Sequence, residues 1–181
     1  MIIPGLTGFI GPKAAARLAN QIGVLGGQPA ADEQRVEGPG VRLISSRGWT
    51  LRQGEINCAI VGNIDWLDKE LANTQTKRGP AHALLSSYEA HGPDLLRVIG
   101  GRFSICVWDE TNRTGVVACD RFGILPVFWA QTPDGDLLIG PTATVINQMM
   151  AEAPRLSDQG IFNYLHYHML PAPDTVFHGV H

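Results

Sequence analysis

The chain has 181 residues, of which 44% are hydrophobic and 17% charged, and its formal net charge is −3. This composition is typical of a folded globular protein, and the length fits one domain with a fragment of a second. No basic cluster points to a nucleic-acid partner. The sequence also has no signal-peptide pattern and no apolar run of membrane-spanning length, so we expect a cytoplasmic protein without membrane contact.

The first part of the chain alternates glycine-rich and apolar stretches. Residues 5–11 predict a strand whose glycines allow another backbone to approach closely. Pro12 is expected to open a helix with an apolar face. Residues 23–40 predict a loop because they are rich in glycine, proline and polar residues. Further along the chain we expect two strands and a short helix, at residues 41–45, 56–61 and 67–71.

The second part predicts helices around two hairpins. Pro80 should begin a helix that buries one face and ends near Gly92. Residues 103–108 form a continuous apolar run, as expected of a strand buried on both faces. The remaining elements are strands at residues 115–119, 126–130 and 136–139, and helices at residues 142–150 and 157–168. Antiparallel strands in series, flanked by amphipathic helices, predict an α+β fold.

A series of short motifs gives a more specific indication. The series comprises Tyr88-Glu89-Ala90-His91-Gly92, Gly101-Arg102-Phe103-Ser104, Val107-Trp108-Asp109, Asp120-Arg121-Phe122-Gly123, Pro126 and Phe128-Trp129. Their order and spacing resemble the asparagine synthetase family over about sixty residues, and the context of several motifs makes the likeness specific. The resemblance implies an N-terminal class II glutamine amidotransferase domain, which has the N-terminal-nucleophile hydrolase fold, a four-layer αββα sandwich.

The end of the chain resembles the same family. Residues 156–165 and 173–180 are similar to the bridge that leads into a C-terminal synthetase domain. The resemblance therefore implies an amidotransferase-like domain at residues 1–154 and the start of the bridge at residues 155–181. It implies no cofactor in this domain, while ATP and Mg²⁺ would bind to the synthetase domain, which this sequence lacks. The expected partners are that synthetase domain of the same chain and, as a possibility, a second copy in a homodimer.

The catalytic positions of the family carry unexpected residues. Class II domains begin with Cys-Gly-Ile-x-Gly, and the cysteine is an N-terminal nucleophile activated by its own amine. Pro4 occupies the cysteine position here, and it has no nucleophilic side chain. The Asn-Gly pair of the oxyanion hole falls in reversed order on Gly62-Asn63, and a shift by one residue turns a strand side chain to the other face. The aspartate that binds the substrate ammonium falls on Pro80.

We therefore expect no catalytic residue and degenerate substrate-binding positions at Gly62, Asn63 and Pro80. Asp120, Arg121 and Gly123 are predicted to be structural, with the Asp120 carboxylate paired to a nearby donor, although a substrate role stays open. The three cysteines are interpreted as buried structural thiols, as in a reducing compartment, and Thr7 as an ordinary strand residue. A metal site is not expected, since the C-terminal histidines lack a shared helix face. The cysteines are Cys58, Cys106 and Cys119, and the C-terminal histidines are His166, His168, His178 and His181.

Taken with the resemblance, these substitutions imply a glutaminase-deficient domain. It would act as a scaffold in an ATP-dependent, amide-forming ligase, and it resembles the domains of β-lactam synthetases and lasso-peptide cyclases in this respect. Two alternatives stay open: a glutamine-hydrolysing asparagine synthetase, and a stand-alone binding domain. The sequence does not define the acceptor carboxylate or the amine donor.

Overall fold

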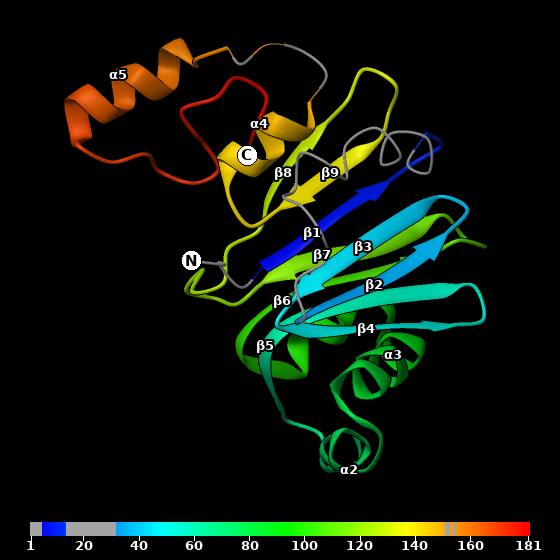
Figure 1. Ribbon diagram of the computed structural model, residues 1–181. Coiled ribbons are helices and arrows are strands. Elements are labelled where there is room, and N and C mark those ends of the chain that lie inside the picture. Colours follow the sequence, from blue (N-terminus) through cyan, green and yellow to red (C-terminus); the bar gives the residue numbers. More distant parts are fainter. Residues whose placement is uncertain (1–4, 14–31, 151–152, 154) are drawn as a thin grey trace.

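The computed structural model describes residues 5–13, 32–150, 153 and 155–181 (Figure 1). The described strands form two antiparallel sheets. In spatial order, the five-stranded sheet comprises β2 (Glu33–Gly38), β3 (Val41–Ser46), β1 (Gly5–Ile10), β9 (Leu137–Gly140) and β8 (Phe128–Gln131). The four-stranded sheet comprises β4 (Gly48–Gln53), β5 (Ile56–Trp66), β6 (Ile99–Asp109) and β7 (Thr114–Cys119). The described helices are α2 (Lys69–Arg78), α3 (Pro80–His91), the 3₁₀ helix η1 (Gly92–Arg97), α4 (Ala143–Met149) and α5 (Asp158–Tyr167).

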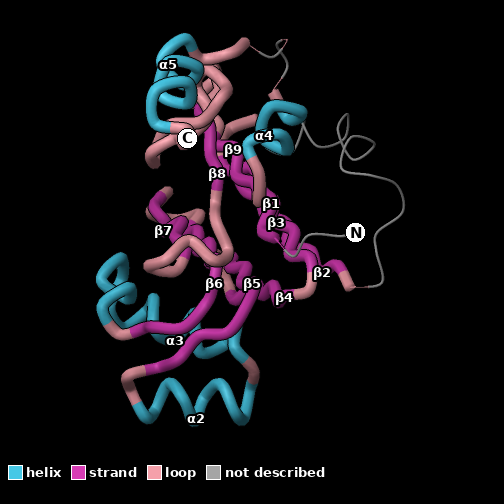
Figure 2. The backbone as a smooth tube through the Cα atoms, turned by 90° about the vertical axis from the view of Figure 1, so that its left-hand side faces the viewer, coloured by secondary structure: helices cyan, strands magenta, loops and turns pink. Residues whose placement is uncertain are grey.

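Three hydrophobic clusters hold four layers together (Figure 2). In the outer cluster, Leu84 of α3 packs on the four-stranded sheet. The middle cluster joins the two sheets, with Leu6 and Leu43 on one side and Val61 on the other. In the third cluster, Ile146 of α4 packs on the far face of the five-stranded sheet. The order helix, sheet, sheet, helix confirms the predicted α+β fold with an αββα sandwich.

β5 and β6, the central strands of the four-stranded sheet, are mostly apolar because both of their faces are covered. Along β5, Cys58 and Ile60 face the helices, whereas Ala59 and Val61 face the other sheet. Successive side chains of a strand point to opposite faces, so a strand covered on both faces is mostly apolar, and Asn57, Ser104 and Asp109 are the buried polar residues of this pair. The prediction of a buried strand at residues 103–108 is confirmed, and that strand extends over Ile99–Asp109 as β6.

The glycines of β1 permit the close approach that the sequence predicts. A Cβ atom on Gly8 would lie 2.6 Å from Leu43 Cδ2 and 2.9 Å from the carbonyl oxygen of Arg42. A Cβ atom on Gly5 would overlap the ring of Pro141. Both glycines are buried, and β1 pairs with β3 on one side and β9 on the other. Larger residues at these two positions would force the neighbouring strands apart.

The structure corrects the prediction of a loop at residues 23–40, because residues 33–38 form the edge strand β2. Of its six residues only Val36 is buried, so the apolar alternation that marks a strand is absent. The strand β4 was not predicted either, and α2 continues to Arg78, well beyond the predicted end at residue 71. Residues 14–31, which include most of the helix predicted after Pro12, lie outside the described part of the chain.

The predicted helix starts are confirmed by their caps. Thr142 Oγ1 accepts a hydrogen bond from Val145 N, and Ser157 Oγ accepts one from Gly160 N. Such caps satisfy N–H groups that have no partner within the helix. None of the helices formed by the described residues is long and apolar enough to cross a membrane.

We predict that Leu84→Ala lowers the free energy of unfolding by about 2–5 kcal/mol, the range for leucine truncation in a packed core. Leu84 is fully buried between α3 and the four-stranded sheet. Urea denaturation followed by circular dichroism measures the change. Leu67→Ala is the matched control, because Leu67 is 74% exposed, and it should change stability by less than about 0.5 kcal/mol. Equal losses in the two variants would contradict the packing described here.

Candidate functional site

The start of β1 is where the family places its nucleophile. The resemblance predicts that position at Pro4, which lies outside the described residues, and Gly5 directly after it is buried. Gly5 pairs with Ser46 at the end of β3, and Leu6 pairs with Ser45. The hydroxyl groups of Ser45 and Ser46 are buried and have no hydrogen-bond partner among the residues that the structure describes. Two unpaired polar groups therefore lie beside the first residues of β1.

Gly62 and Asn63 occupy the end of β5 beyond its last pairing with β4. The last pair of that ladder joins Val61 to Gly48. Gly62 has φ +93°, and a Cβ atom there would overlap the carbonyl oxygen of Arg102, so only glycine fits. Ile64 packs in the outer cluster with the helices, which places Asn63 on the opposite face of β5, where it is exposed. The residue before Gly62 is Val61, which is buried and has no side-chain amide.

Pro80 begins α3, as the sequence predicts, on the helix-covered face of the four-stranded sheet. The N-cap residue is Gly79 with φ +95°, and no side chain caps the helix. The first turn of α3 contains no acidic residue. This helix end therefore presents no carboxylate that could bind an ammonium group.

Asp120 organises the loop that follows β7. Its Oδ1 accepts hydrogen bonds from the backbone N–H groups of Phe122 and Ile124, both at 3.1 Å, and its Oδ2 accepts one from Leu125 at 3.0 Å. The N–H of Gly123, which has φ +60°, donates to the Asp120 carbonyl oxygen at 2.9 Å and closes the turn. Asp120 is 3% exposed. The donors of its carboxylate are thus backbone groups, whereas the Arg121 side chain lies exposed beside them.

Two opposing effects set the pKa of Asp120. Burial of the carboxyl group would raise its pKa, but the backbone N–H groups of Leu125, Ile124 and Phe122 hold the pKa below its ordinary value. The same hydrogen bonds fix Leu125, whose Cδ1 would lie 2.5 Å from a Cβ atom at Gly62. The Asp120 loop therefore places an apolar side chain against the backbone where the family's oxyanion hole is expected.

The cysteines differ in exposure. Cys58 and Cys106 are fully buried, whereas Cys119 is exposed at the end of the edge strand β7, which corrects the prediction that all three are buried. Burial raises the pKa of the Cys58 thiol to about 12 and raises that of Cys106 as well. Neither buried thiol provides the thiolate that a cysteine nucleophile requires near neutral pH.

The remaining candidates are spread over the fold. Thr7 lies inside β1, paired with Ile44, and is not at a chain end. His166 lies in α5 and His178 near the end of the chain. No group of three or more side chains suited to metal binding occurs within residues 5–13, 32–150, 153 and 155–181.

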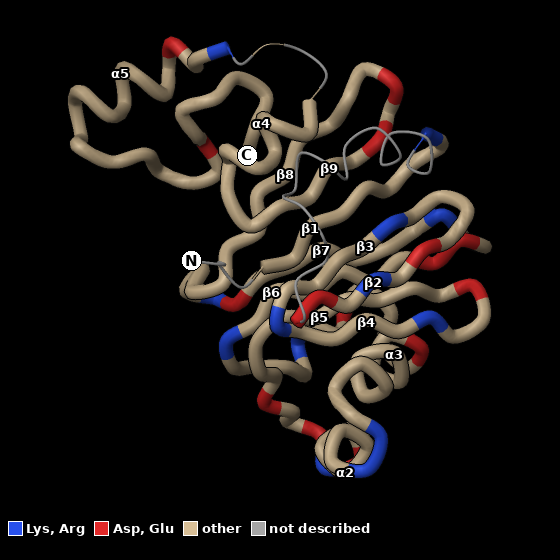
Figure 3. Tube along the Cα trace, viewed as in Figure 1, with Lys and Arg blue, Asp and Glu red and all other residues tan. Residues whose placement is uncertain are grey.

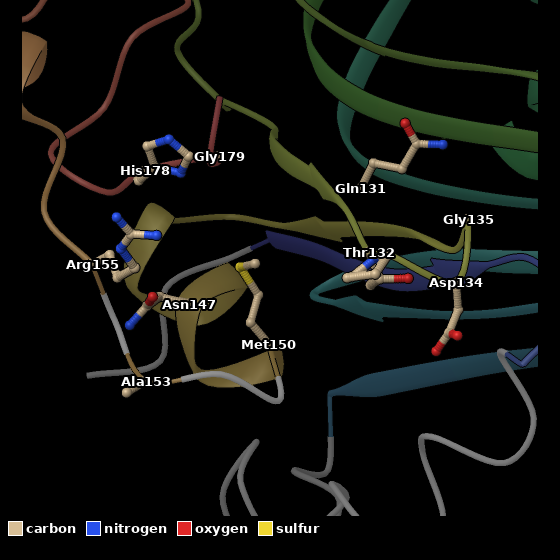
Figure 4. Close-up of a pocket in the computed structure, with 11 residues that line it drawn as sticks. Gln131, Thr132, Asp134, Gly135, Asn147, Met150, Ala153, Arg155, His178 and Gly179 are labelled. Carbon is tan, nitrogen blue, oxygen red and sulfur yellow. The ribbon is translucent and has the colours of Figure 1, made fainter.

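A cavity of about 770 Å³ lies apart from Gly62, Asn63, Pro80 and Asp120, although His178 is one of the residues that line it (Figure 4). It is lined by the β8–β9 turn, α4 and the C-terminal segment. Arg155, Asn147 and His178 lie at one end, and Thr132 and Asp134 lie at the other. Its lining does not include positions 62, 63, 80 or 120, so the sequence analysis did not find this cavity. The sequence gives only a weak indication of this cavity, because polar residues in turns are common on any protein surface.

Comparison with known proteins shows which protein family the chain belongs to. Residues 57–181 match the glutamine amidotransferase domain family, and because this match covers more than half of the chain, the chain belongs to that family. Proteins named putative asparagine synthetase [glutamine-hydrolyzing], from Mycobacterium bovis and Mycobacterium tuberculosis, are similar to it. They are 25% identical over 104 residues, which make up 56% of this chain and 16% of each relative.

We predict that Asp120→Asn lowers the free energy of unfolding by about 1–3 kcal/mol at neutral pH, because a hydrogen-bonded charge is replaced by a weaker acceptor. The pKa of Asp120 is lower in the folded state, so its contribution is present above the unfolded pKa of about 3.9 and is lost as the pH falls through the folded-state pKa. The stability difference between wild type and variant should therefore shrink below about pH 4, as measured by urea denaturation at several pH values.

Asp94→Asn is the matched control, since the Asp94 side chain is 73% exposed and pairs only with the exposed Arg97 among the described residues. We expect a change of less than about 1 kcal/mol, as for other surface ion pairs. An unchanged stability in Asp120→Asn would contradict the structural role of the loop.

Proposed function

We propose that this chain is a glutamine amidotransferase-like domain that does not hydrolyse glutamine and that serves as a scaffold for a synthetase domain. The complete ligase would activate a carboxylate with ATP and join it to an amine. The single observation that carries this proposal is the proline at residue 4, where the resemblance predicts the nucleophilic cysteine. Proline offers no thiol, and the chain has Met1, Ile2 and Ile3 ahead of it.

The surroundings of the expected reaction centre support the loss of glutaminase chemistry. An oxyanion hole needs preorganised donors aimed at the developing charge. Val61 precedes Gly62 and has no side-chain amide, while the Asn63 side chain is exposed. Leu125 packs where the backbone of Gly62 would have to face the substrate. These features fit a site that has lost its polar donors and kept its scaffold.

The substrate-binding and replacement residues point the same way. Glutamine binding by its ammonium group calls for a carboxylate, and the first turn of α3 has none. The buried Cys58 and Cys106 have raised pKa values, so neither substitutes for the missing nucleophile. The scaffold role rests on the family and on the mycobacterial relatives, of which the matched stretch is only 16%. ATP and Mg²⁺ would bind to the synthetase part.

The first test is direct. The protein should release no ammonia from glutamine above the buffer background, and a glutamine-analogue alkylator should leave it unlabelled. A glutamate dehydrogenase-coupled assay measures the ammonia, and intact-mass spectrometry measures the label. Turnover on the order of 1 per second, as in typical enzymes, would instead favour a glutamine-hydrolysing asparagine synthetase.

A second test asks whether the loss extends beyond one residue. Met1–Ile3 are replaced by a single methionine and Pro4→Cys is introduced, so that methionine removal exposes a cysteine at the family position. The new thiol should react with iodoacetamide, but glutamine should not be hydrolysed, because removal of one oxyanion donor alone costs about 100- to 1000-fold. The ammonium-binding acid is missing as well, so the substrate would not be oriented.

The control for this test is the same construction with Cys119→Ser, which removes the one exposed thiol among the described cysteines. Any remaining label then reports the new cysteine. Rapid glutamine hydrolysis by either form would show that the pocket is intact and that the assignments of Gly62, Asn63 and Pro80 are wrong.

A further inference from the structure

Helix α5 exposes its apolar residues instead of burying them. Ile161, Phe162 and Leu165 are 40%, 60% and 71% exposed, and Tyr164 is exposed as well. Spacings of three and four residues make Ile161 a neighbour of Tyr164 and Leu165, and Phe162 a neighbour of Leu165, on the helix surface. A surface helix normally turns such a stripe towards the core and its polar residues towards water. In α5 the arrangement is inverted, and we call these four side chains the α5 face.

The inner side of α5 is polar and small. Asn163 and Gly160 are the buried residues of the helix. Asn163 Nδ2 donates a hydrogen bond to Asp174 Oδ2 at 3.2 Å. A Cβ atom on Gly160 would lie 2.5 Å from the carbonyl oxygen of Thr175, so the helix and the segment after it touch backbone to backbone. The orientation of α5 is thus determined by specific contacts, and the α5 face points outward as a result.

The segment that carries α5 is itself tied to the core. Thr175 Oγ1 donates to the carbonyl oxygen of Val180 at 2.8 Å, and Val180 and Phe177 pack in the cluster that α4 shares with the five-stranded sheet. The backbone of His181 exchanges two hydrogen bonds with Trp129 of β8, at 2.8 and 2.9 Å. The α5 face is therefore presented on a fixed support (Figure 1).

Charged residues are scarce on α5. Asp158, in the first turn, is the only residue of α5 that is Asp, Glu, Lys or Arg. Figure 3 shows charged residues along the sheets and α2, whereas the body of α5 has none. Depletion of charge with enrichment of aromatic and aliphatic residues is typical of the buried core of a protein–protein interface. An exposed apolar face of this kind indicates an interaction site.

We propose that the α5 face is the docking surface for the synthetase domain, which deepens the proposed function and rests on it. The family match runs through α5 to residue 181. In the mycobacterial relatives, 84% of the chain lies outside the matched 104 residues, so those proteins have much further chain to pack. A polypeptide that continued past His181 would leave from the same end of the molecule, where β8, α4 and the α5 segment meet (Figure 1).

The test uses the complete gene product that contains residues 1–181, folded and in dilute solution. Hydroxyl-radical footprinting with mass spectrometry measures the reactivity of Phe162, Tyr164 and Leu165. Leu67 and Phe122, which are 74% and 84% exposed, serve as internal references in the same molecule. We expect the α5 face to be protected at least about fivefold relative to its exposure here, because the core of an interface is dry, while both references stay reactive.

A matched pair of variants tests whether the α5 face itself forms the protected contact. Leu165→Asp should restore the reactivity of Phe162 and open the interdomain linker to limited proteolysis, whereas Leu67→Asp should change neither. An α5 face as reactive as the references would overturn the proposal, and so would a gene product with no synthetase domain. Protection that disappears on tenfold dilution, with dimers seen by mass photometry, would assign the face to a second copy and also overturn it.

Glutamine hydrolysis is measured separately on the same sample, so the two proposals fail independently. A protected α5 face in a protein that releases ammonia from glutamine would leave the docking surface standing and refute the loss of glutaminase activity. A reactive α5 face in a protein without ammonia release would refute the docking surface and leave the loss of glutaminase activity standing.

Discussion

The antiparallel pairing of β5 with β6 is the constraint on which the rest of the fold depends. The two strands pair over eleven residues, from Ile56 with Asp109 to Trp66 with Ile99. One face of the pair packs against the helices and the other packs against the five-stranded sheet. Both faces of the pair are buried at residues 57–61 and 103–107, which favours apolar side chains there, and the ladder hydrogen bonds satisfy backbone groups that water cannot reach. The strands, loops and helices that define the candidate site are all positioned relative to it.

The candidate site lies where this pair extends beyond its neighbour. Once β4 has paired its last residue with Val61, β5 continues through Gly62 and Asn63 without cover on that side. The loop after β7 then comes back over the sheet, held by the Asp120 carboxylate, and brings Leu125 against Gly62. The structural charge and the apolar contact are therefore parts of one arrangement. The stability of this arrangement comes from burial and backbone hydrogen bonds.

In helix α5 of the C-terminal segment, by contrast, small and polar residues form the inner contacts and apolar residues are exposed. The helix is attached through Gly160 and Asn163, and its larger apolar side chains face outward. These side chains do not pack in the core of the sandwich, which fits a surface that another protein domain covers. The two regions thus differ: the candidate site is held by buried backbone contacts, and the C-terminal segment presents an apolar face.

The sequence by itself determined the elements whose local pattern is strong. The apolar run of β6, the Gly79-Pro80 start of α3 and the caps at Thr142 and Ser157 all specify their structure within a few residues, and the order of motifs indicated the αββα fold. The polar edge strand β2 was missed, because its pairing with β3, and not its own composition, makes it a strand. The exposure of Cys119, the face on which Asn63 lies, the packing of Leu125 on Gly62 and the outward direction of α5 were decided only by the tertiary structure. Each depends on which distant segment covers a position, and a local sequence pattern contains no record of that neighbour.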